Sequence, residues 1–320
     1  MEIKVSFGVI EGEQLNNWVF YRINYPRKGQ MKKKINFDRF PCDICGSSDA
    51  VEVPFARFYT GNQPIHICKE CGFVYVRDRR SSLEIANSWS NEIFGKGYTA
   101  HIPAVKARQV YVADFIDKNI GLKNKKVSEI GAGEGQFLDI IRKEYGACVF
   151  GIEPSGMNCK ILSRLKIPYF QGTIEDYGAA HKKNQSDIVA LLWTLENCLS
   201  CKDMLFGARK ILSPNGYVVI ATGSRILVPF KKPLGKYLSK NPSDTHSFRF
   251  SAQSLRGLLS ATGFKVVFEN SYIDSDILCI IARKGKMSKK NIWRKDNYLD
   301  VVDFFRRWHK ESLFYKNTNN

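Results

Sequence analysis

The segment Val127–Leu138, which reads VSEIGAGEGQFL, determines how the chain is interpreted. Three glycines at alternate positions follow a short β-type run and precede an amphipathic stretch. Glycines so placed let a ligand lie close against the backbone. The spacing is GxGxG rather than the dinucleotide pattern GxGxxG, because Gln136 occupies the place of the last glycine. An acid, Glu134, stands in the turn and no P-loop lysine follows, so the segment suits neither a pyrophosphate nor a nucleoside triphosphate.

Strand-like and helix-like segments alternate around this loop, from about residue 121 to 285. Apolar runs predict strands at Lys126–Ile130, Ala147–Ile152, Ile167–Gln171, Asp187–Trp193, Tyr217–Thr222, Phe264–Glu269 and Ile277–Arg283. Amphipathic patterns predict helices at Gln136–Tyr145, Gly156–Leu165, Lys202–Leu212 and Ser251–Thr262. Ser213–Gly216 predicts a turn before the fifth strand, and the short loop between the last two strands predicts that they pair antiparallel. The pattern indicates an α/β fold with a doubly wound, seven-stranded, Rossmann-like sheet.

Four cysteines near the N-terminus have the spacing of a zinc site. They form two CxxCG units, Cys42–Gly46 and Cys68–Gly72, and the strand-like stretches PFARFYTG and IHICKECGFVYV are expected to carry them. Two thiolates on one tight turn supply half of a tetrahedral zinc shell, and the glycine lets the turn adopt positive φ. Four sulfur ligands leave no open position, so we expect one structural Zn in a zinc ribbon, bound by Cys42, Cys45, Cys68 and Cys71. The alternative is four unrelated thiols.

Taken together, these motifs resemble the class I S-adenosylmethionine-dependent methyltransferases. EIGAGEG at Glu129–Gly135 is similar to their first motif, and Asp187–Trp193 is similar to their fourth strand. KILSPNGYVVI (Lys210–Ile220) and FSAQSLRGLLSATGFKVV (Phe250–Val267) resemble the elements that follow in that family. The resemblance spans about residues 85–285, and it implies that the ligand of the glycine loop is S-adenosylmethionine.

The resemblance also implies which residues bind the cofactor. Glu153 ends the second predicted strand, 22 residues after Gly131, where an acid can accept hydrogen bonds from two ribose hydroxyls. The glycines would pass under the homocysteine part, and Glu129 would brace the loop or contact the amino group. Gln171–Glu175 would line the adenine. The expected cofactor-binding residues are Glu129, Gly131, Gly133, Gly135, Glu153, Ile174 and Trp193.

The zinc ribbon, a helical connector and this fold together resemble a narrower group, the methyltransferases of nucleotide-sugar and surface-polysaccharide pathways. DTHSFRFS (Asp244–Ser251) is similar to a stretch of that group and implies that His246 lies on the substrate side. LEN (Leu195–Asn197) departs at its last residue from the group's Leu-Glu-His. We expect His246 to be a general base, because imidazole titrates near neutral pH, and Glu196 to orient the acceptor or the base. The alternatives are a His246 that caps the next helix and a Glu196 that is only a solvated acid.

Composition bears on the acceptor. Lys+Arg 49 against Asp+Glu 31 gives a formal net charge of +18, which favours an anionic partner. The Asn/Asp-Pro-Pro-aromatic motif of enzymes that methylate the amino groups of bases is missing after the fourth predicted strand. We therefore expect methyl transfer to oxygen or carbon of a small anionic acceptor, a sugar or nucleotide-sugar. Two alternatives remain open: an RNA methyltransferase that grips RNA with its zinc ribbon, and a non-catalytic docking module.

The sequence predicts five parts: a leader at 1–30, the zinc ribbon at 31–80, a helical connector at 81–120, the methyltransferase domain at 121–285 and a C-terminal helix at 286–320. Our hypothesis for the leader is that Met31 is the natural start and that residues 1–30 come from a misplaced start codon. The C-terminal helix is expected to pack on the domain or on a partner in a homodimer. No apolar run approaches the roughly 18 residues of a membrane helix and no signal-peptide core is visible, so we expect no transmembrane segment and a cytoplasmic location.

Two further features flank the expected site. Tyr98 is a candidate to close over the cofactor, whereas His101 is interpreted as a bystander. The basic, apolar-studded loop Arg225–Lys240 suits a diphosphate-bearing acceptor, a membrane surface or a protein partner.

Overall fold

The computed structural model describes residues 38–82, 84–85, 103–180, 185–223, 233–238, 246–270, 277–287 and 293–317. All of these belong to one unit, residues 36–320. Several predictions concern residues outside the described ranges: the leader 1–30, Met31 as the start, Tyr98, His101 and most of the loop Arg225–Lys240.

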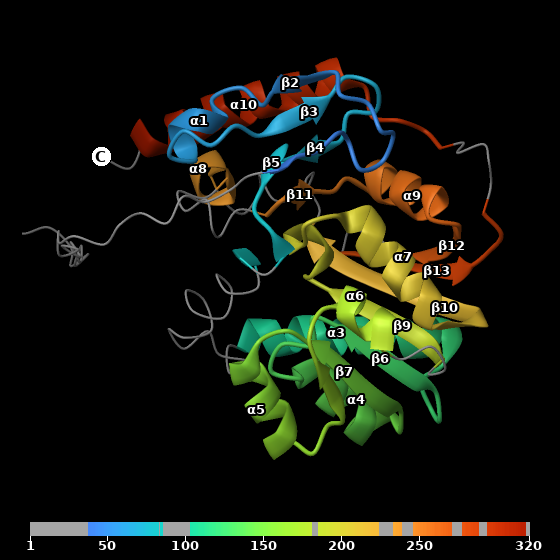
Figure 1. The fold of residues 1–320 in the computed structure, drawn as a ribbon. Helices are drawn as coiled ribbons and strands as arrows, with labels where there is room; N and C mark the ends of the chain where they lie inside the picture. The colour runs from blue at the N-terminus through green and yellow to red at the C-terminus, as the bar shows by residue number, and fades with distance from the viewer. Residues whose placement is uncertain are drawn as a thin grey trace, which may run out of the picture. The chain divides into compact units, whose positions relative to one another are not determined.

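A seven-stranded sheet forms the centre of this unit (Figure 1). Its strands are β6 (Lys126–Ile130), β7 (Cys148–Glu153), β8 (Tyr169–Gln171), β9 (Ser186–Leu192), β10 (Leu212–Gly223), β12 (Phe264–Glu269) and β13 (Ile277–Lys284). They lie in the order β12-β13-β10-β9-β6-β7-β8, and β13 runs antiparallel to both of its neighbours while the other pairs are parallel. The predicted doubly wound sheet with an antiparallel closing pair is confirmed. The strand order reverses between β9 and β6, and ligands of such sheets bind at the carboxyl ends of the strands beside this point.

Helices cover both faces of the sheet. One face packs against α3 (Pro103–Ile120), α4 (Gln136–Tyr145) and α5 (Gly156–Arg164), and the other against α6 (Ile174–Ala180), α7 (Cys201–Ile211) and α9 (Ala252–Ala261). The alternation of side chains along each strand produces these two layers: in β10, Val219 and Ala221 face the first set of helices, whereas Val218 and Ile220 face the second.

Two details of this domain differ from the sequence prediction. The Ser213–Gly216 segment lies inside β10, at a register shift between Leu212 and Tyr217, rather than in a turn before the strand. Helix α6 was not expected, because it is short and contains Gly178. It begins where the Asp176 carboxylate accepts hydrogen bonds from the backbone N–H and the hydroxyl of Thr173.

The cysteine-rich region forms a four-stranded sheet of its own. Its order is β11-β4-β3-β2, with β2 at Ala50–Glu52, β3 at His66–Cys68, β4 at Val74–Tyr75 and β11 at Phe248–Arg249, all paired antiparallel. A separate pair joins β1 (Asp38–Arg39) to β5 (Asp78–Arg79). The last strand of the four-stranded sheet, β11, comes from the segment just before α9, far along the chain from the other three.

The predicted strand in PFARFYTG is wrong, because this stretch contains the short helix α1 (Ala56–Tyr59). A left-handed turn at Phe55 (φ 62°) precedes the helix, and the Thr60 hydroxyl donates to the Ala56 carbonyl at 3.0 Å. These local bonds satisfy the backbone of the segment without a partner strand.

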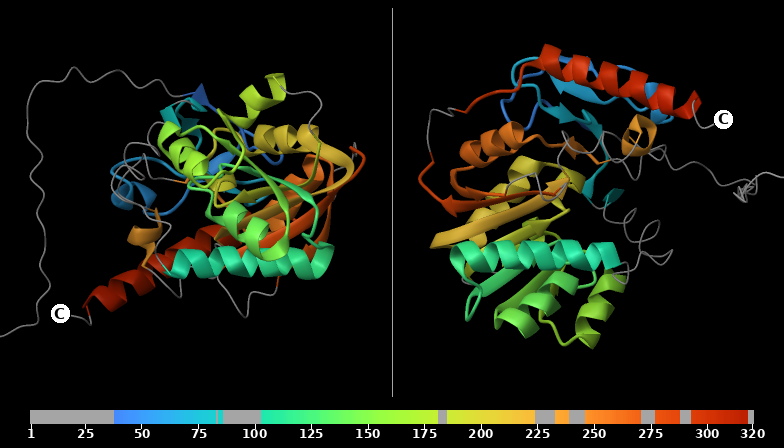
Figure 2. Two further views of the ribbon diagram at one scale, coloured as in Figure 1. Left: turned by 90° about the horizontal axis from the view of Figure 1, so that it is seen from below. Right: turned by 180° about the vertical axis from the view of Figure 1, so that it is seen from behind.

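The C-terminal helix α10 (Tyr298–Asn317) packs on the four-stranded sheet together with α8 (Leu234–Leu238), as the right-hand view of Figure 2 shows for α10. Phe305 and Trp308 of α10 share a buried cluster with Ile65 and Ile67 of the ribbon region. No helix among the described residues is both long and apolar enough to span a bilayer.

Candidate functional site

A cavity of about 640 Å³ opens beside the carboxyl ends of β6, β7, β9 and β10. The short 3-10 helix η3 (Leu195–Asn197), which follows β9, and the segment His246–Phe250 also line it. Of the residues proposed from sequence, these line it: Glu129, Gly131, Gly133, Glu153, Ile174, Trp193, Glu196 and His246. Gly135 does not line the cavity. The structure therefore brings the expected cofactor residues and the expected catalytic residues to a single space.

The glycine loop adopts left-handed backbone conformations, with φ of 71° at Gly131, 55° at Gly133 and 76° at Gly135. A Cβ at Gly131 would lie 2.6 Å from the Thr194 side chain, and a Cβ at Gly135 would collide with Leu162. At Gly133 a Cβ would meet no atom within 4 Å, and this residue borders the cavity. Two of the glycines are thus required by packing, whereas Gly133 keeps the backbone open toward a ligand.

Glu153, at the end of β7, holds the glycine loop. Its Oε2 accepts from the Gly133 N–H at 2.8 Å, and its Oε1 accepts from the Ser155 N–H at 2.9 Å and from Asn158 Nδ2 at 3.3 Å. Burial raises the pKa of Glu153, and these three hydrogen bonds counteract the rise. Each carboxylate oxygen can accept more than one hydrogen bond, so the group retains acceptor capacity.

Glu129, at the end of β6, is buried beside the same loop. Its Oε2 has no hydrogen-bond partner among the described residues. Burial, and secondarily the charge of Glu153, raises the pKa of Glu129 well above its ordinary value. A cationic group in the cavity would stabilise the ionised form of this carboxyl. The orphaned oxygen therefore fits the ammonium group of an amino-acid-containing cofactor.

His246 is oriented by a residue that the sequence analysis treated only as a departure from a pattern. The Asn197 Nδ2 donates to the Trp193 carbonyl at 2.8 Å, which leaves Asn197 Oδ1 facing His246 Nδ1 at 2.5 Å. An amide oxygen can only accept, so His246 Nδ1 carries the proton and the neutral ring presents an unprotonated Nε2. Trp193 supports this arrangement from a strained left-handed conformation, with φ of 52°.

Glu196 lies on η3, is buried and lines the cavity. Burial raises its pKa to about 7, and the Thr222 hydroxyl partly counteracts this. One carboxylate oxygen, Oε2, lacks a partner within the described part of the chain. A carboxyl with this pKa changes protonation near neutrality, and it is not the solvated acid that the alternative reading allowed.

Three further residues of the cavity wall were not singled out from sequence: Asn197, Thr222 and Arg249. Arg249 stands between two aromatic residues in the stretch DTHSFRFS, and this position was the sequence feature that could have marked it as a site residue. Its burial could not be foreseen, because it depends on β11 pairing with the distant β4.

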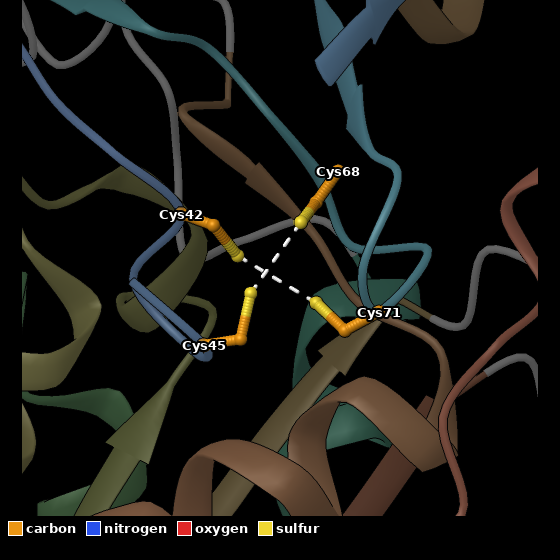
Figure 3. A group of neighbouring side chains, drawn as sticks. All are labelled: Cys42, Cys45, Cys68 and Cys71. Carbon is orange, nitrogen blue, oxygen red and sulfur yellow. Dashed lines mark hydrogen bonds between the residues drawn. The ribbon is translucent and has the colours of Figure 1, made fainter. Parts of the chain in front are cut away.

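The four cysteines of the CxxCG units converge in space (Figure 3). Their sulfur atoms all lie within 4.8 Å of one another, with 3.6 Å between Cys42 and Cys71 and 3.4 Å between Cys45 and Cys68. Zn–S bonds of about 2.3 Å in a tetrahedron separate the sulfurs by about 3.8 Å. Gly46 and Gly72 have φ of 76° and 69°, as the turns require. The donor set and the spacing therefore fit a tetrahedral zinc ion.

Arg79 connects this cluster to the cavity wall. Its guanidinium forms a buried ion pair with Asp43, at 2.6 Å, and donates to the carbonyls of Val76 and Leu199 at 2.7 and 2.6 Å. The guanidinium carbon also lies 4.5 Å from the ring centre of Phe248. Asp43 belongs to the first cysteine turn and Leu199 follows η3, so the cysteine cluster is tied to the segment that carries Glu196 and Asn197.

The chain is similar to known methyltransferases. The methyltransferase domain family matches residues 105–269, just over half of the chain. A ubiquinone biosynthesis O-methyltransferase of Vibrio parahaemolyticus is 31% identical over 117 residues, which cover 34% of this chain and 48% of that protein. The protein of the same name from Azorhizobium caulinodans is 24% identical over 191 residues, 53% of this chain and 74% of the other. The chain thus spans about half the length of the first of these curated relatives.

A solved structure shows the same fold. The Burkholderia thailandensis 1,6-didemethyltoxoflavin-N1-methyltransferase, with bound 1,6-didemethyltoxoflavin and S-adenosylhomocysteine, aligns at a TM-score of 0.50 with 14% identity, over 67% of this chain and 96% of that one. The family match covers α4, β6–β10 and the glycine loop, which are the elements that build the cavity. The chain therefore belongs to the methyltransferase domain family and has the α/β fold of the class I S-adenosylmethionine-dependent enzymes.

Proposed function

We propose that this protein transfers a methyl group from S-adenosylmethionine to a small acceptor, a sugar or nucleotide-sugar, at oxygen or at an acidic carbon. One observation carries the proposal: a single cavity joins the glycine loop and its two buried acids to the His246–Asn197 pair. The name of the curated relatives, which are O-methyltransferases, supports oxygen as the methylated atom.

The cofactor-binding residues are those that surround the loop after β6. Glu153 would accept hydrogen bonds from the ribose hydroxyls, and Gly133 would lie against the homocysteine part. Glu129, with its orphaned oxygen, would accept from the amino group. Ile174 and Trp193 would contact the adenine side. Bound here, the cofactor supplies an electrophilic methyl group on a sulfonium.

The residues of η3 and of the segment around His246 would prepare the acceptor. His246, held by Asn197 through Nδ1, would take the acceptor's proton at Nε2 as the methyl group is transferred. Glu196 would accept a hydrogen bond from the acceptor hydroxyl and fix its direction, since its carboxylate has an oxygen without a partner in the described residues. In-line displacement depends above all on such positioning.

Zinc is proposed as a structural ion. Four thiolates fill its coordination sphere, so the metal would stabilise the ribbon and would not touch the acceptor. The sheet that carries two of these cysteines also contains β11, and α10 covers it. This sheet reaches the cavity wall through β11, and that arrangement supports a small acceptor in preference to RNA.

The test has two stages. Calorimetry of S-adenosylhomocysteine with the full chain should show one site, and radiolabelled S-adenosylmethionine should then label one of a panel of sugars and nucleotide-sugars. The His246→Ala variant should keep the calorimetric binding and lose the labelling. If folded, zinc-loaded protein does not bind S-adenosylhomocysteine, the proposed function is wrong.

A further inference from the structure

The region around the cavity contains two buried arginines with opposite environments. Arg79 is fully engaged by the Asp43 carboxylate and two backbone carbonyls. Arg249 is equally buried, at 3% exposure, but it forms no ion pair within the described ranges. Its Nη1 donates to the His246 carbonyl at 2.8 Å, while Nε and Nη2 have no hydrogen-bond partner among those residues.

A buried guanidinium with two unpartnered nitrogens, like that of Arg249, is unusual. Burying donors without partners costs free energy, and both nitrogens are shielded from solvent, so an anion reaches them only when side chains around the guanidinium move aside. Among the described residues, the guanidinium also contacts the Tyr237 ring, whose centre lies 5.5 Å from the guanidinium carbon. Burial lowers the pKa of Arg249, yet an arginine side chain keeps its proton in proteins. Within the described ranges, the guanidinium is therefore a buried charge without a counterion.

Arg249 lines the cavity on the side of His246. It lies on β11, three residues after His246, and its own hydrogen bond holds the His246 carbonyl. The glycine loop and Glu153 follow β6 and β7 and line the same cavity, whereas the hydrogen bond of Arg249 goes to the segment that carries His246. An anion that reached Arg249 would consequently belong to the molecule placed next to His246.

We propose that Arg249 binds an oxyanion of the methyl acceptor, a carboxylate or a phosphate, and thereby selects acidic acceptors. The planar guanidinium offers Nε and Nη2 as a parallel pair of donors, which matches the two oxygens of such a group. This inference rests on the proposed function for the identity of the acceptor, but the anion site itself can be tested without knowing the acceptor.

Two probes, inorganic phosphate and acetate, would be titrated into the full chain saturated with S-adenosylhomocysteine, at constant ionic strength. The Nε–H signal of Arg249 in the ¹⁵N spectrum, assigned by its loss in Arg249→Gln, should shift and saturate with one or both anions. The anion that binds should also raise the melting temperature of the wild type, because a ligand of the native state stabilises it. A larger response to phosphate than to acetate would identify the phosphate form.

The Arg249→Gln variant should lose this anion-dependent stabilisation. Its affinity for the anion should be at least about 10-fold weaker than that of the wild type, because a charge-assisted pair of hydrogen bonds is lost. Arg249→Lys, which keeps the charge but not the paired donors, should fall between the two. Arg256→Gln is the matched control: Arg256 is half-exposed, pairs with Glu269 at 2.7 Å and does not line the cavity. It should respond as the wild type does.

Three results would overturn the inference: no saturable shift of the Arg249 signal with either anion, unchanged stabilisation in Arg249→Gln, or a loss of S-adenosylhomocysteine affinity in that variant. The last would assign the guanidinium to the cofactor's carboxylate. If the wild type binds no S-adenosylhomocysteine but phosphate still shifts Arg249 in the ligand-free chain, the proposed function fails and the anion site stands.

Discussion

Replacing Glu153 with glutamine tests the cofactor site. The hydrogen bonds of the carboxylate allow the losses of stability and of cofactor affinity to be estimated. Oε2 accepts from the Gly133 N–H and Oε1 from the Ser155 N–H. Glutamine offers one acceptor oxygen and one NH₂ group, so one of these backbone donors would face another donor. A buried donor left without its acceptor costs about 1–3 kcal/mol. We expect the ligand-free Glu153→Gln variant to lose about that much free energy of unfolding, measured by urea titration.

The effect on cofactor affinity should be larger. A hydrogen bond from a hydroxyl to a charged carboxylate contributes about 1.5–3 kcal/mol, and two ribose hydroxyls are expected to use this group. Because glutamine keeps one acceptor oxygen, the expected combined loss is below this sum, at about 2–4 kcal/mol, which corresponds to a dissociation constant about 30- to 900-fold higher. Calorimetric titration with S-adenosylhomocysteine measures this directly. Glu144→Gln, on the exposed side of α4, is the control and should change neither quantity.

The two measurements together can refute the reasoning. A variant that is less stable but binds S-adenosylhomocysteine as tightly as the wild type would mean that Glu153 braces the loop and does not contact the ribose. A variant that loses neither stability nor affinity would contradict the hydrogen bonds themselves.

Three other expectations follow from the site. Replacing Asn197 with leucine should remove the acceptor that fixes His246, so ¹⁵N NMR should show the His246 proton leaving Nδ1 while S-adenosylhomocysteine affinity is unchanged; an unaltered tautomer would dismiss the role of Asn197. The pKa of Glu196 is raised from about 4.5 to about 7, so the carboxyl contributes stability below pH 4.5 that is lost as the pH rises to 7, about 3 kcal/mol in all. Relative to wild type, Glu196→Gln should therefore gain unfolding free energy between pH 5 and pH 8, and parallel pH curves would count against the buried carboxyl. Substituting Cys68 with serine should lower zinc content, measured by mass spectrometry, from one ion per chain to well below one and should reduce thermal stability; full zinc content would show that a different ligand set binds the ion.

The sequence predicted the sheet because its central strands are largely buried apolar runs and its helices are amphipathic. Lys126–Ile130, Gln136–Tyr145 and Phe264–Glu269 have the predicted bounds, since each is delimited by a glycine or a sharp change in polarity. The glycine loop and the four cysteines were also predictable, because only a few residue types can satisfy their backbone conformations and ligand chemistry.

The remaining features depend on contacts between distant segments. The two residues of β11 are too few to show a strand period, and their pairing with β4 connects positions about 170 apart in the chain. Asn197 looked like a missing histidine until its amide was found between Trp193 and His246. The elevated pKa of Glu196 likewise depends on burial, which sequence does not report for an isolated acid.

The pairing of β11 with β4 also affects how the protein can be made and divided. During synthesis, residues 38–82 leave the ribosome long before Phe248–Arg249 are made. Until β11 pairs with it, the edge of β4 is therefore an unpaired strand edge. The apolar surface that α10 later covers is exposed for even longer. A separately expressed ribbon would keep both surfaces open and would be prone to self-association. Transfer of this ribbon to another enzyme would therefore also require a matching strand and helix in the C-terminal third of the recipient.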